Sequence, residues 1–283
     1  MTLLTFAPNI YIKEYPIRYA GCTFSSCMTI AKLSNGRLWI HSPCEITPQL
    51  KAEIEALGPV GVIIAPGNYH HLHVKSCQDA FPSAQTFICP GVEKKQPTLK
   101  YDAILQETKP EESYAADLEQ VLIQGNRVIN EVAFLHKESK TLILTDSIEL
   151  IGDSTPGTNL VLRFWWKYLL RMWNVPKPAP EYQMGWNDKV LAKKSMEQIM
   201  QWDFQQVIIS HVQTSHSPRK RTQHNRLTHA TSGYIVNINK GGGNHLPLVV
   251  RCEYCGRQRE DCCAECMERH SCLAFLQNWQ LFI

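Results

Sequence analysis

The sequence lacks the long hydrophobic run of a membrane-spanning helix, because its longest stretch without Asp, Glu, Lys or Arg, residues 56–74, is interrupted by Pro59, Pro66 and three His. Its N-terminus, Met1–Pro8, has no basic segment followed by a continuous apolar stretch, so it does not have the pattern of a secretory signal. An internal repeat with a period of about 20–50 residues is also absent. Hydrophobic residues make up 44% of the 283 residues, which excludes disorder throughout the chain. We therefore expect a cytoplasmic globular protein.

Charge and cysteine are unevenly distributed along the chain. Residues 1–211 contain 20 Lys and Arg against 21 Asp and Glu, whereas residues 212–283 contain 9 against 5. Six of the eleven cysteines lie between Cys252 and Cys272. In a reducing compartment, clustered thiols are metal ligands more often than disulfide partners. This uneven composition predicts a main domain over 1–211, a polar basic linker over 212–250 and a Cys-rich tail over 251–283.

The main domain alternates strand-like and helix-like segments. We expect strands over 28–33, 37–41, 60–65, 85–89, 118–123, 131–136, 141–145 and 204–210. We expect helices over 47–57, 71–80, 159–175 and 188–200, with a polar loop over 93–117 and a Pro-rich break over 176–180. A hairpin followed by alternating strands and helices predicts a layered α/β or α+β domain.

Metal-type side chains follow three of the predicted strands. The segment Asn68–His73 has three histidines after strand 60–65, Asp146 follows strand 141–145, and His211 follows strand 204–210. Side chains at strand ends converge on one edge of a sheet, where α/β folds place their chemistry. Imidazole and carboxylate ligands suit Zn²⁺, Fe or Mn. In the alternative interpretation these residues only cap strand ends and bond to nearby backbone.

Five segments together resemble the metallo-β-lactamase-like hydrolase superfamily over roughly residues 5–211. They are Trp39–Glu45, Ala65–His71, Gly125–Glu131, Thr141–Asp146 and Trp202–His211. Within the superfamily, the sequence is most similar to the family called domain of unknown function 4336. The resemblance implies an α+β fold, the αββα sandwich, to which an atypical Cys-rich C-terminal tail is added.

The first motif of the superfamily has two His one residue apart and then Asp-His two positions later, and two registers are open here. In one, His70 and His71 take the Asp-His positions while Pro66 and Asn68 replace the first two His. In the other, His71 and His73 form the first pair. We favour the first register, because it leaves room for the helix that follows this motif in the superfamily.

The ligand set that the resemblance implies is incomplete. The middle His of the superfamily should fall near Gly125–Asn130, where this chain has none. The resemblance therefore implies one divalent metal, with zinc favoured, instead of a two-metal centre. The expected metal ligands are His70, His71, Asp146 and His211, of which His70 and Asp146 are the candidate catalytic residues. Four residues are candidates for supporting the metal ligands through hydrogen bonds or for contacting the substrate: Asn68, His73, Asn130 and Glu131. For Asn130 and Glu131, we favour the simpler role of a hydrogen bond at the start of a strand.

Two functions follow from the resemblance. The first is a metal-dependent hydrolase with a degenerate site, acting on an ester, thioester, amide or phosphodiester of a small molecule. The second is a catalytically inactive fold that acts as a binding protein. The retained Asp146 and His211 favour the first function, and the missing histidine favours the second.

The segment Asn159–Val175 is rich in aromatic residues and carries cations four residues apart, at Arg163, Lys167 and Arg171. A helix would align these cations in one stripe. We favour a helix that packs on the domain or forms a lid over the strand ends. Binding to a membrane surface is the alternative.

The Cys-rich tail contains two Cys-x-x-Cys pairs, Cys252 with Cys255 and Cys263 with Cys266, separated by seven residues. Four thiolates suit a separate structural zinc. Incidental cysteines in an unfolded tail are the alternative. The basic cluster Arg219–Arg221 has no interleaved aromatic residues, so we do not expect nucleic-acid binding.

Overall fold

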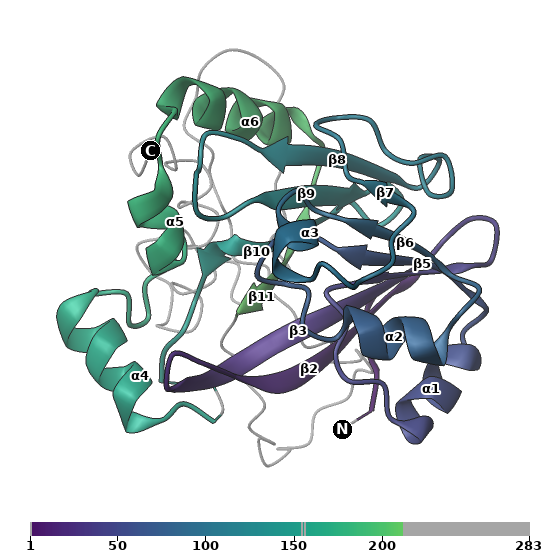
Figure 1. The fold of residues 1–283 in the computed structure, drawn as a ribbon, viewed down its shortest axis with the longest axis horizontal. Helices are drawn as coiled ribbons and strands as arrows, with labels where there is room; N and C mark the ends of the chain where they lie inside the picture. Colours follow the sequence, from purple (N-terminus) through teal and green to yellow (C-terminus); the bar gives the residue numbers. More distant parts are fainter. Residues whose placement is uncertain (1, 154, 156, 212–283) are drawn as a thin grey trace, which may run out of the picture.

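Two mixed β-sheets form the centre of the computed structural model, which describes residues 2–153, 155 and 157–211 (Figure 1). The first sheet has seven strands in chain order: β1 (Leu4–Ala7), β2 (Ile10–Tyr19), β3 (Cys22–Lys32), β4 (Leu38–His41), β5 (Val60–Ala65), β6 (Gln85–Ile88) and β7 (Ala103–Ile104). The second has four strands in the order β11 (Gln206–His211), β10 (Thr141–Glu149), β9 (Glu131–His136) and β8 (Leu118–Ile123).

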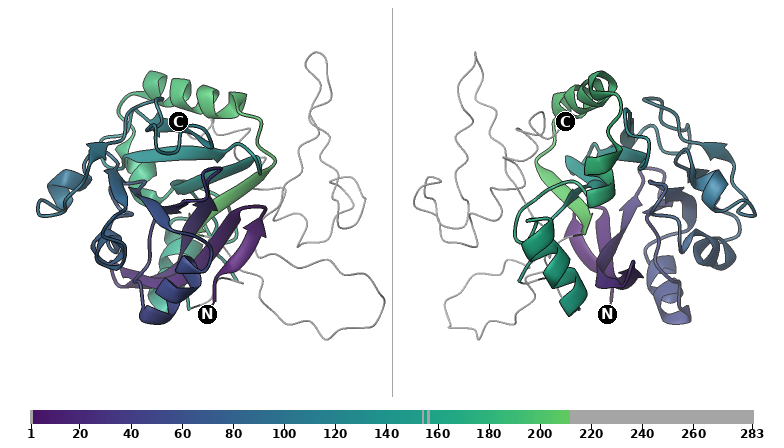
Figure 2. Two further views of the ribbon diagram at one scale, coloured as in Figure 1. Left: turned by 90° about the vertical axis from the view of Figure 1, so that its right-hand side faces the viewer. Right: turned by 60° about the vertical axis from the view of Figure 1, so that its left-hand side comes forward.

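Helices cover the outer faces of both sheets. They are α1 (Pro48–Glu55), α2 (Val74–Ala80), α3 (Val92–Lys95), α4 (Leu160–Phe164), the π-helical turn η1 (Trp165–Leu169), α5 (Pro180–Gly185) and α6 (Lys189–Gln201). Figures 1 and 2 show α6 along the second sheet and α1 and α2 on the side of the first. The expected αββα sandwich is therefore present.

Alternating side chains of β9 explain why its central residues, Val132 to Leu135, are all apolar. Val132 and Phe134 pack in the core between the two sheets. Ala133 and Leu135 point to the other face and join the core beneath α5 and α6. A strand that is buried on both faces has no solvent side on which polar residues would be favoured. Ile208 of β11 likewise faces the core between the sheets.

Parallel strand pairs occur next to antiparallel ones in each sheet. In the first sheet, β1 to β4 pair antiparallel, whereas β4 to β7 pair parallel. In the second, β10 pairs antiparallel with β9 and parallel with β11. The crossovers α1 and α2 connect the parallel strands β4, β5 and β6. As a result, the loops after β4 and β5 lie at the edge of the sandwich where β10 and β11 carry their polar residues.

Several predicted elements differ from the observed ones. Strands β1 and β2 and the outer half of β3 were not predicted, because β2 has only two buried residues, Ile10 and Ile12, and a Pro within it. The expected loop over 93–117 contains part of α3 and all of β7. Helix α5 begins directly after the Pro-rich break, with Pro180 in its first turn.

The single helix predicted over 159–175 is wrong in its second half. The helical segment ends at Leu169, and Arg171 has a positive φ of 53°, which is outside helical geometry. Arg171 therefore does not continue a stripe with Arg163 and Lys167. The break follows a π-type hydrogen bond, in which the Leu170 N–H donates to the Trp165 carbonyl at 2.8 Å.

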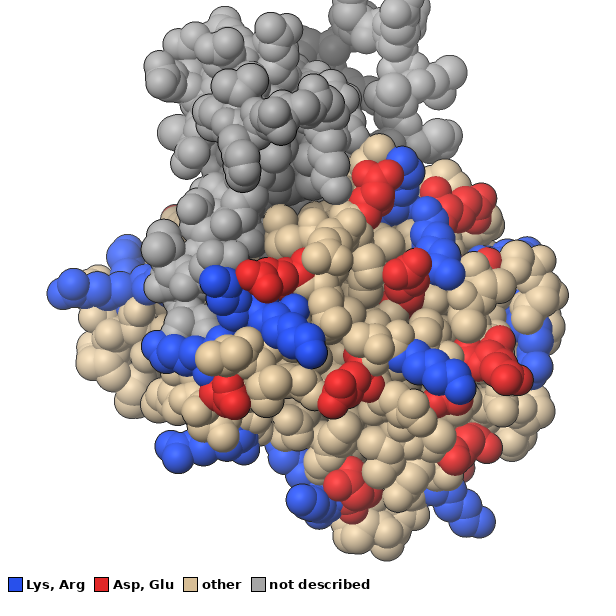
Figure 3. Space-filling view, turned by 90° about the horizontal axis from the view of Figure 1, so that it is seen from above, with Lys and Arg blue, Asp and Glu red and all other residues tan. Residues whose placement is uncertain are grey.

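None of the described helices is long and apolar enough to cross a bilayer. Over the described residues in Figure 3, positive and negative side chains are interspersed on the face seen from above. Lys193 and Glu197 of α6 form one such pair at 3.8 Å. The predicted linker and the predicted zinc site of the tail lie outside the described residues.

Candidate metal centre

Three polar side chains converge where β5, β10 and β11 meet. His70 lies in the loop after β5, and His211 is the last residue of β11. Asp146 lies within β10, in the stretch where the pairing with β11 shifts register between Leu144 and Glu149. Such an irregularity re-aims side chains on a strand. It explains why Asp146 reaches the two histidines from inside a strand instead of from its end.

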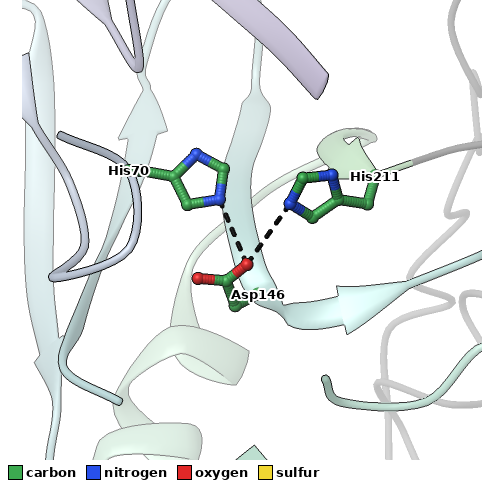
Figure 4. Close-up of side chains that lie close together, drawn as sticks. All are labelled: His70, Asp146 and His211. Carbon is green, nitrogen blue, oxygen red and sulfur yellow. Dashed lines mark hydrogen bonds and ion pairs between the residues drawn. The ribbon is translucent and has the colours of Figure 1, made fainter. Parts of the chain in front are cut away.

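The three side chains are close enough to share one ion. His70 Nε2 lies 3.1 Å from Asp146 Oδ1, and His211 Nε2 lies 3.4 Å from the same oxygen (Figure 4). Their candidate ligand atoms all lie within 4.8 Å of one another, and all three residues are buried. Within the part of the chain that the structure describes, no other group of three or more His, Cys, Asp or Glu residues meets this criterion.

The far ring nitrogen of each histidine is held by a second contact. Nδ1 of His70 is hydrogen-bonded to the Ser42 hydroxyl at 2.7 Å. Nδ1 of His211 donates to the Ser25 carbonyl at 2.9 Å, because a carbonyl oxygen can only accept. Contacts of this kind fix the ring orientation and leave Nε2 as the ligand atom in metal-binding histidines. Both Nε2 atoms therefore face Asp146 in the arrangement that a metal would require.

Asp146 has one carboxylate oxygen without a hydrogen-bond partner. Oδ2 is buried and unpaired among the described residues, whereas Oδ1 faces both histidines. Buried carboxylate oxygens are normally satisfied by donors or by a cation. Two imidazoles and a carboxylate also form a familiar three-ligand set for zinc, with room for a further ligand. The donor set and the unpaired oxygen both fit a divalent metal.

The charges of the site depend on its burial and on the ion pairs. Burial opposes the ionisation of Asp146, but His70 and His211 outweigh it and hold the pKa of this carboxyl well below its ordinary value. Burial alone would lower the pKa of His211, but the contacts with Asp146 and Glu149 raise it to about 9. Without a metal, the chain therefore holds a proton between His211 and Asp146 at neutral pH. The geometry needs a cation there, either a proton or a metal.

Glu131 holds the backbone on which Asp146 is mounted. Its carboxylate, which is fully buried, accepts the N–H groups of Thr145 at 2.7 Å, Asp146 at 3.1 Å and Ser147 at 2.7 Å, and the Ser147 hydroxyl at 2.9 Å. Burial and the charge of Asp146 raise the pKa of Glu131 to about 7, against the hydrogen bonds from Thr145 and Ser147. From β9, Glu131 thus positions the backbone of β10 around Asp146 and does not contact the histidines.

The asparagines predicted near the site fasten its loop to β9. Asn68 Oδ1 accepts the N–H of Asn130 at 3.1 Å, and Asn68 Nδ2 donates to the Val128 carbonyl at 2.9 Å. Asn130 Nδ2 donates to the Pro90 carbonyl at 3.0 Å. With their side-chain atoms engaged in this way, both residues hold the loop that carries His70.

The structure brings together three of the four predicted ligands. His71 is half-buried, its Nδ1 has no partner among the described residues, and it is not in the converging group. His73 pairs instead with the exposed carboxylate of Glu45 at 3.1 Å. The sequence interpretation did not single out Ser42, although it follows β4 directly and so obeys the same strand-end rule as the ligands.

Further charged groups lie near the three converging side chains. Burial raises the pKa of Glu149 to about 8, against the charge of His211. Lys95 Nζ lies 3.2 Å from the centroid of the Tyr69 ring. Burial lowers the pKa of Lys95, while the charges of Asp146 and Glu181 oppose that shift. A positive charge therefore stands within electrostatic reach of the three-residue centre.

Comparisons with known proteins agree with this architecture. Residues 21–164 match the protein family described as domain of unknown function (DUF4336). No curated protein matches the sequence. Among solved structures, the metallo-β-lactamase FIM-1 from Pseudomonas aeruginosa, in its mono-zinc form, is similar with a TM-score of 0.51 at 10% identity, over 74% of this chain and 87% of that chain.

Two further solved structures are similar over the same extent. A metallo-β-lactamase from Erythrobacter litoralis has a TM-score of 0.51 at 12% identity, over 75% of this chain and 89% of that chain. A metallo-β-lactamase from Hirschia baltica has a TM-score of 0.50 at 10% identity, over 74% of this chain and 90% of that chain. At such low identity the likeness establishes the metallo-β-lactamase fold and leaves the chemistry to be argued from the site.

Proposed function

This chain belongs to the DUF4336 family, and we propose that it is a metal-dependent hydrolase with a single-metal site at His70, Asp146 and His211. The observation that carries the proposal is the buried meeting of two imidazoles with a carboxylate whose Oδ2 has no partner among the described residues. Structural ion pairs are usually satisfied on both oxygens. An unpaired buried carboxylate oxygen beside two imidazole Nε2 atoms fits the ligand set of a metal.

The metal would be held by Nε2 of His70, Nε2 of His211 and the carboxylate of Asp146. Zinc is the expected ion, with iron or manganese as alternatives, because imidazole and carboxylate suit all three. A bound ion of this kind polarises a carbonyl or phosphoryl oxygen and lowers the pKa of water from about 15.7 to about 7. The mono-zinc form of FIM-1 is a precedent, in a protein of the same fold, for a site with one metal.

The residues of the chain would supply binding and proton handling. Asp146 Oδ2 can accept a hydrogen bond from a water or substrate molecule, because only Oδ1 is engaged by the histidines. The positive charge of Lys95 would attract the negatively charged part of a substrate. The substrate class is an ester, thioester, amide or phosphodiester, in each of which an electron-poor centre is attacked by water.

A binding protein without hydrolase activity is the second candidate. The observation that favours it is the small ligand set, since the converging group contains three residues and His71 is not among them. Such a protein would bind the metal and a small molecule but would not turn it over.

Hydrolysis of a panel of chromogenic esters, thioesters, amides and phosphodiesters by the zinc-loaded full chain distinguishes the two candidates. We expect turnover of at least one class, reduced about 100-fold or more in Asp146→Asn. His73→Ala is the matched control, because His73 lies outside the converging group, and it should retain the activity. Lack of turnover in all classes, or equal turnover in Asp146→Asn, would contradict the hydrolase proposal.

A further inference from the structure

Helix α4 and turn η1 expose more large apolar side chains than they bury. Leu162 and Trp166 alone are buried in these two elements. Six other apolar or aromatic side chains are exposed: Leu160, Val161, Phe164, Trp165, Tyr168 and Leu169. We call these six residues the α4–η1 surface. Contiguous apolar surfaces of this kind mark interaction sites, since soluble proteins rarely leave them open to water.

The α4–η1 surface is firmly attached to the sandwich. Asn159 caps α4 by accepting the N–H of Leu162 at 3.0 Å, and its Nδ2 donates to the Gly21 carbonyl at 2.7 Å. Leu162 and Trp166 pack against Cys22 and Phe24 of β3. Figure 1 shows α4 standing out from the body of the molecule beside the β2–β3 hairpin. The inward side is therefore already anchored, which leaves the outward apolar side without a packing role among the described residues.

Positive charges surround this surface. Arg163, Lys167 and Arg171 are exposed, and the sequence has no Asp or Glu between Asp153 and Glu181. Asp153 accepts hydrogen bonds from the Trp173 ring and the Asn174 amide. Aromatic side chains combined with cations are typical of surfaces that lie in the headgroup region of a bilayer with anionic lipids.

Charge also argues against a second copy of this chain as the occupant. A two-fold interface brings the same patch of each subunit together. Asp153 interacts electrostatically with Lys167 and Arg163, but one acidic side chain does not offset three cations, so two like patches that both carry a net positive charge would face each other. An anionic lipid surface satisfies both the apolar side chains and the cations.

We propose that the α4–η1 surface docks on the headgroup layer of an anionic phospholipid membrane. Phe164, Trp165 and Leu169 enter the boundary between headgroups and acyl chains, and Arg163 and Lys167 contact the lipid phosphates. The docking is peripheral, and it does not require the metal centre to be occupied.

Flotation of the full chain with lipid vesicles tests the proposal. We expect the chain to float with vesicles of phosphatidylcholine mixed with phosphatidylserine, to float poorly with phosphatidylcholine alone, and to dissociate as salt is raised. Arg163→Gln combined with Lys167→Gln should weaken binding about 30-fold. Trp165→Ser combined with Leu169→Ser should weaken it about 10-fold or more.

The matched control replaces exposed apolar residues elsewhere. Val190 and Leu191 are exposed on α6, and Val190→Ser combined with Leu191→Ser should float like the unaltered chain. Thermal unfolding of each variant shows whether it is folded, and the charge variant keeps the test valid if the serine variant is not. The proposal is overturned if the unaltered chain does not float with the anionic vesicles. It is also overturned if both α4–η1 variants float as well as the control, or if they change only the oligomeric state.

Discussion

Glu131, on the neighbouring strand β9, accepts the backbone N–H of Asp146 at 3.1 Å. Glu131 therefore fixes the position of Asp146 through the backbone, without contacting the side chains of the converging group. The same carboxylate also accepts the N–H groups on either side, those of Thr145 and Ser147. Three consecutive backbone donors thus point at one buried acid. This arrangement holds β10 in the irregular course that aims Asp146 at His70 and His211.

Replacing Glu131 by Gln should loosen the centre. An amide NH₂ group would face donors where the carboxylate accepts, so we expect zinc affinity to fall about 10–100-fold and the free energy of unfolding to fall by about 1–3 kcal/mol. Competition with a chelator measures the first effect and urea unfolding the second. Glu112→Gln, at an exposed position, is the control and should change neither. Unchanged zinc affinity in Glu131→Gln would show that Glu131 does not position Asp146.

Replacing Ser42 should weaken metal binding through His70. Ser42 is hydrogen-bonded to His70 Nδ1 and has a positive φ of 52°. Ala and Gly both remove the hydroxyl, so each should reduce zinc affinity about 10-fold. Gly tolerates the positive φ, and we expect Ser42→Gly to be about 1 kcal/mol more stable than Ser42→Ala. Equal zinc affinity in Ser42→Ala, Ser42→Gly and the unaltered chain would contradict the role assigned to the hydroxyl.

The stability of the metal-free chain should decrease as pH rises from about 7 to about 9. Folding raises the pKa of His211 from its ordinary value of 6.5 to about 9. It raises the pKa of Glu149 from 4.5 to about 8. Both groups hold more protons in the folded than in the unfolded chain over these ranges. Burial lowers the pKa values of His41, His71 and His136, which act in the opposite direction below about pH 7, so the free energy of unfolding should fall with pH between about 7 and 9.

Urea unfolding in the presence of a chelator, at several pH values, measures this dependence. Glu149→Gln should flatten the part of the curve between about pH 7 and 8, because it removes one of the two groups. Zinc affinity should rise over the same range, since metal and protons compete for His211. A free energy of unfolding that rises from about pH 7 to pH 9 would show that the pKa shifts of His211 and Glu149 have been assigned the wrong sign.

Gly125 should be intolerant of a side chain for two separate reasons. It has a φ of +82°, and a Cβ there would lie 2.0 Å from the Asp188 carbonyl oxygen at the start of α6. Gly21 has a similar φ of +78° but open space around it. We expect Gly21→Ala to cost about 1 kcal/mol from backbone strain alone and Gly125→Ala at least about 2 kcal/mol more. Thermal or urea unfolding compares the two, and equal losses would mean that α6 does not pack closely here.

The central strands and the convergence of His70, Asp146 and His211 could both be predicted from the sequence, because buried strands are recognisable as apolar runs. Strands such as β5 and β9 are buried on both faces, so their central residues are all apolar and they are easy to find. Polar residues that follow or interrupt such strands stand out, as His70, Asp146 and His211 do. Strand β2 was missed because most of its residues are only partly buried, so its alternation is weak.

The contacts that orient His70 and His211 could not be predicted in the same way. His211 donates to the backbone carbonyl of Ser25, which lies 186 residues earlier in the chain, and any residue could supply that carbonyl. The exclusion of His71 also depends on the turn that follows β5, where adjacent residues point in different directions. Arg171 leaves the helix because of a π-type turn for which the local sequence gives no clear signal.

Metal content of the full chain, measured by mass spectrometry at neutral pH, tests the central claim most directly. Replacing the tail residues Cys252, Cys255, Cys263 and Cys266 by Ser removes thiols that could bind a second metal and raise the measured number of metal ions per chain. In that background we predict about one divalent metal per chain, lost when Asp146→Ala and His211→Ala are combined and retained in His73→Ala. An unaltered centre without metal, or equal metal in the double variant, would contradict the assignment of His70, Asp146 and His211 as a metal site.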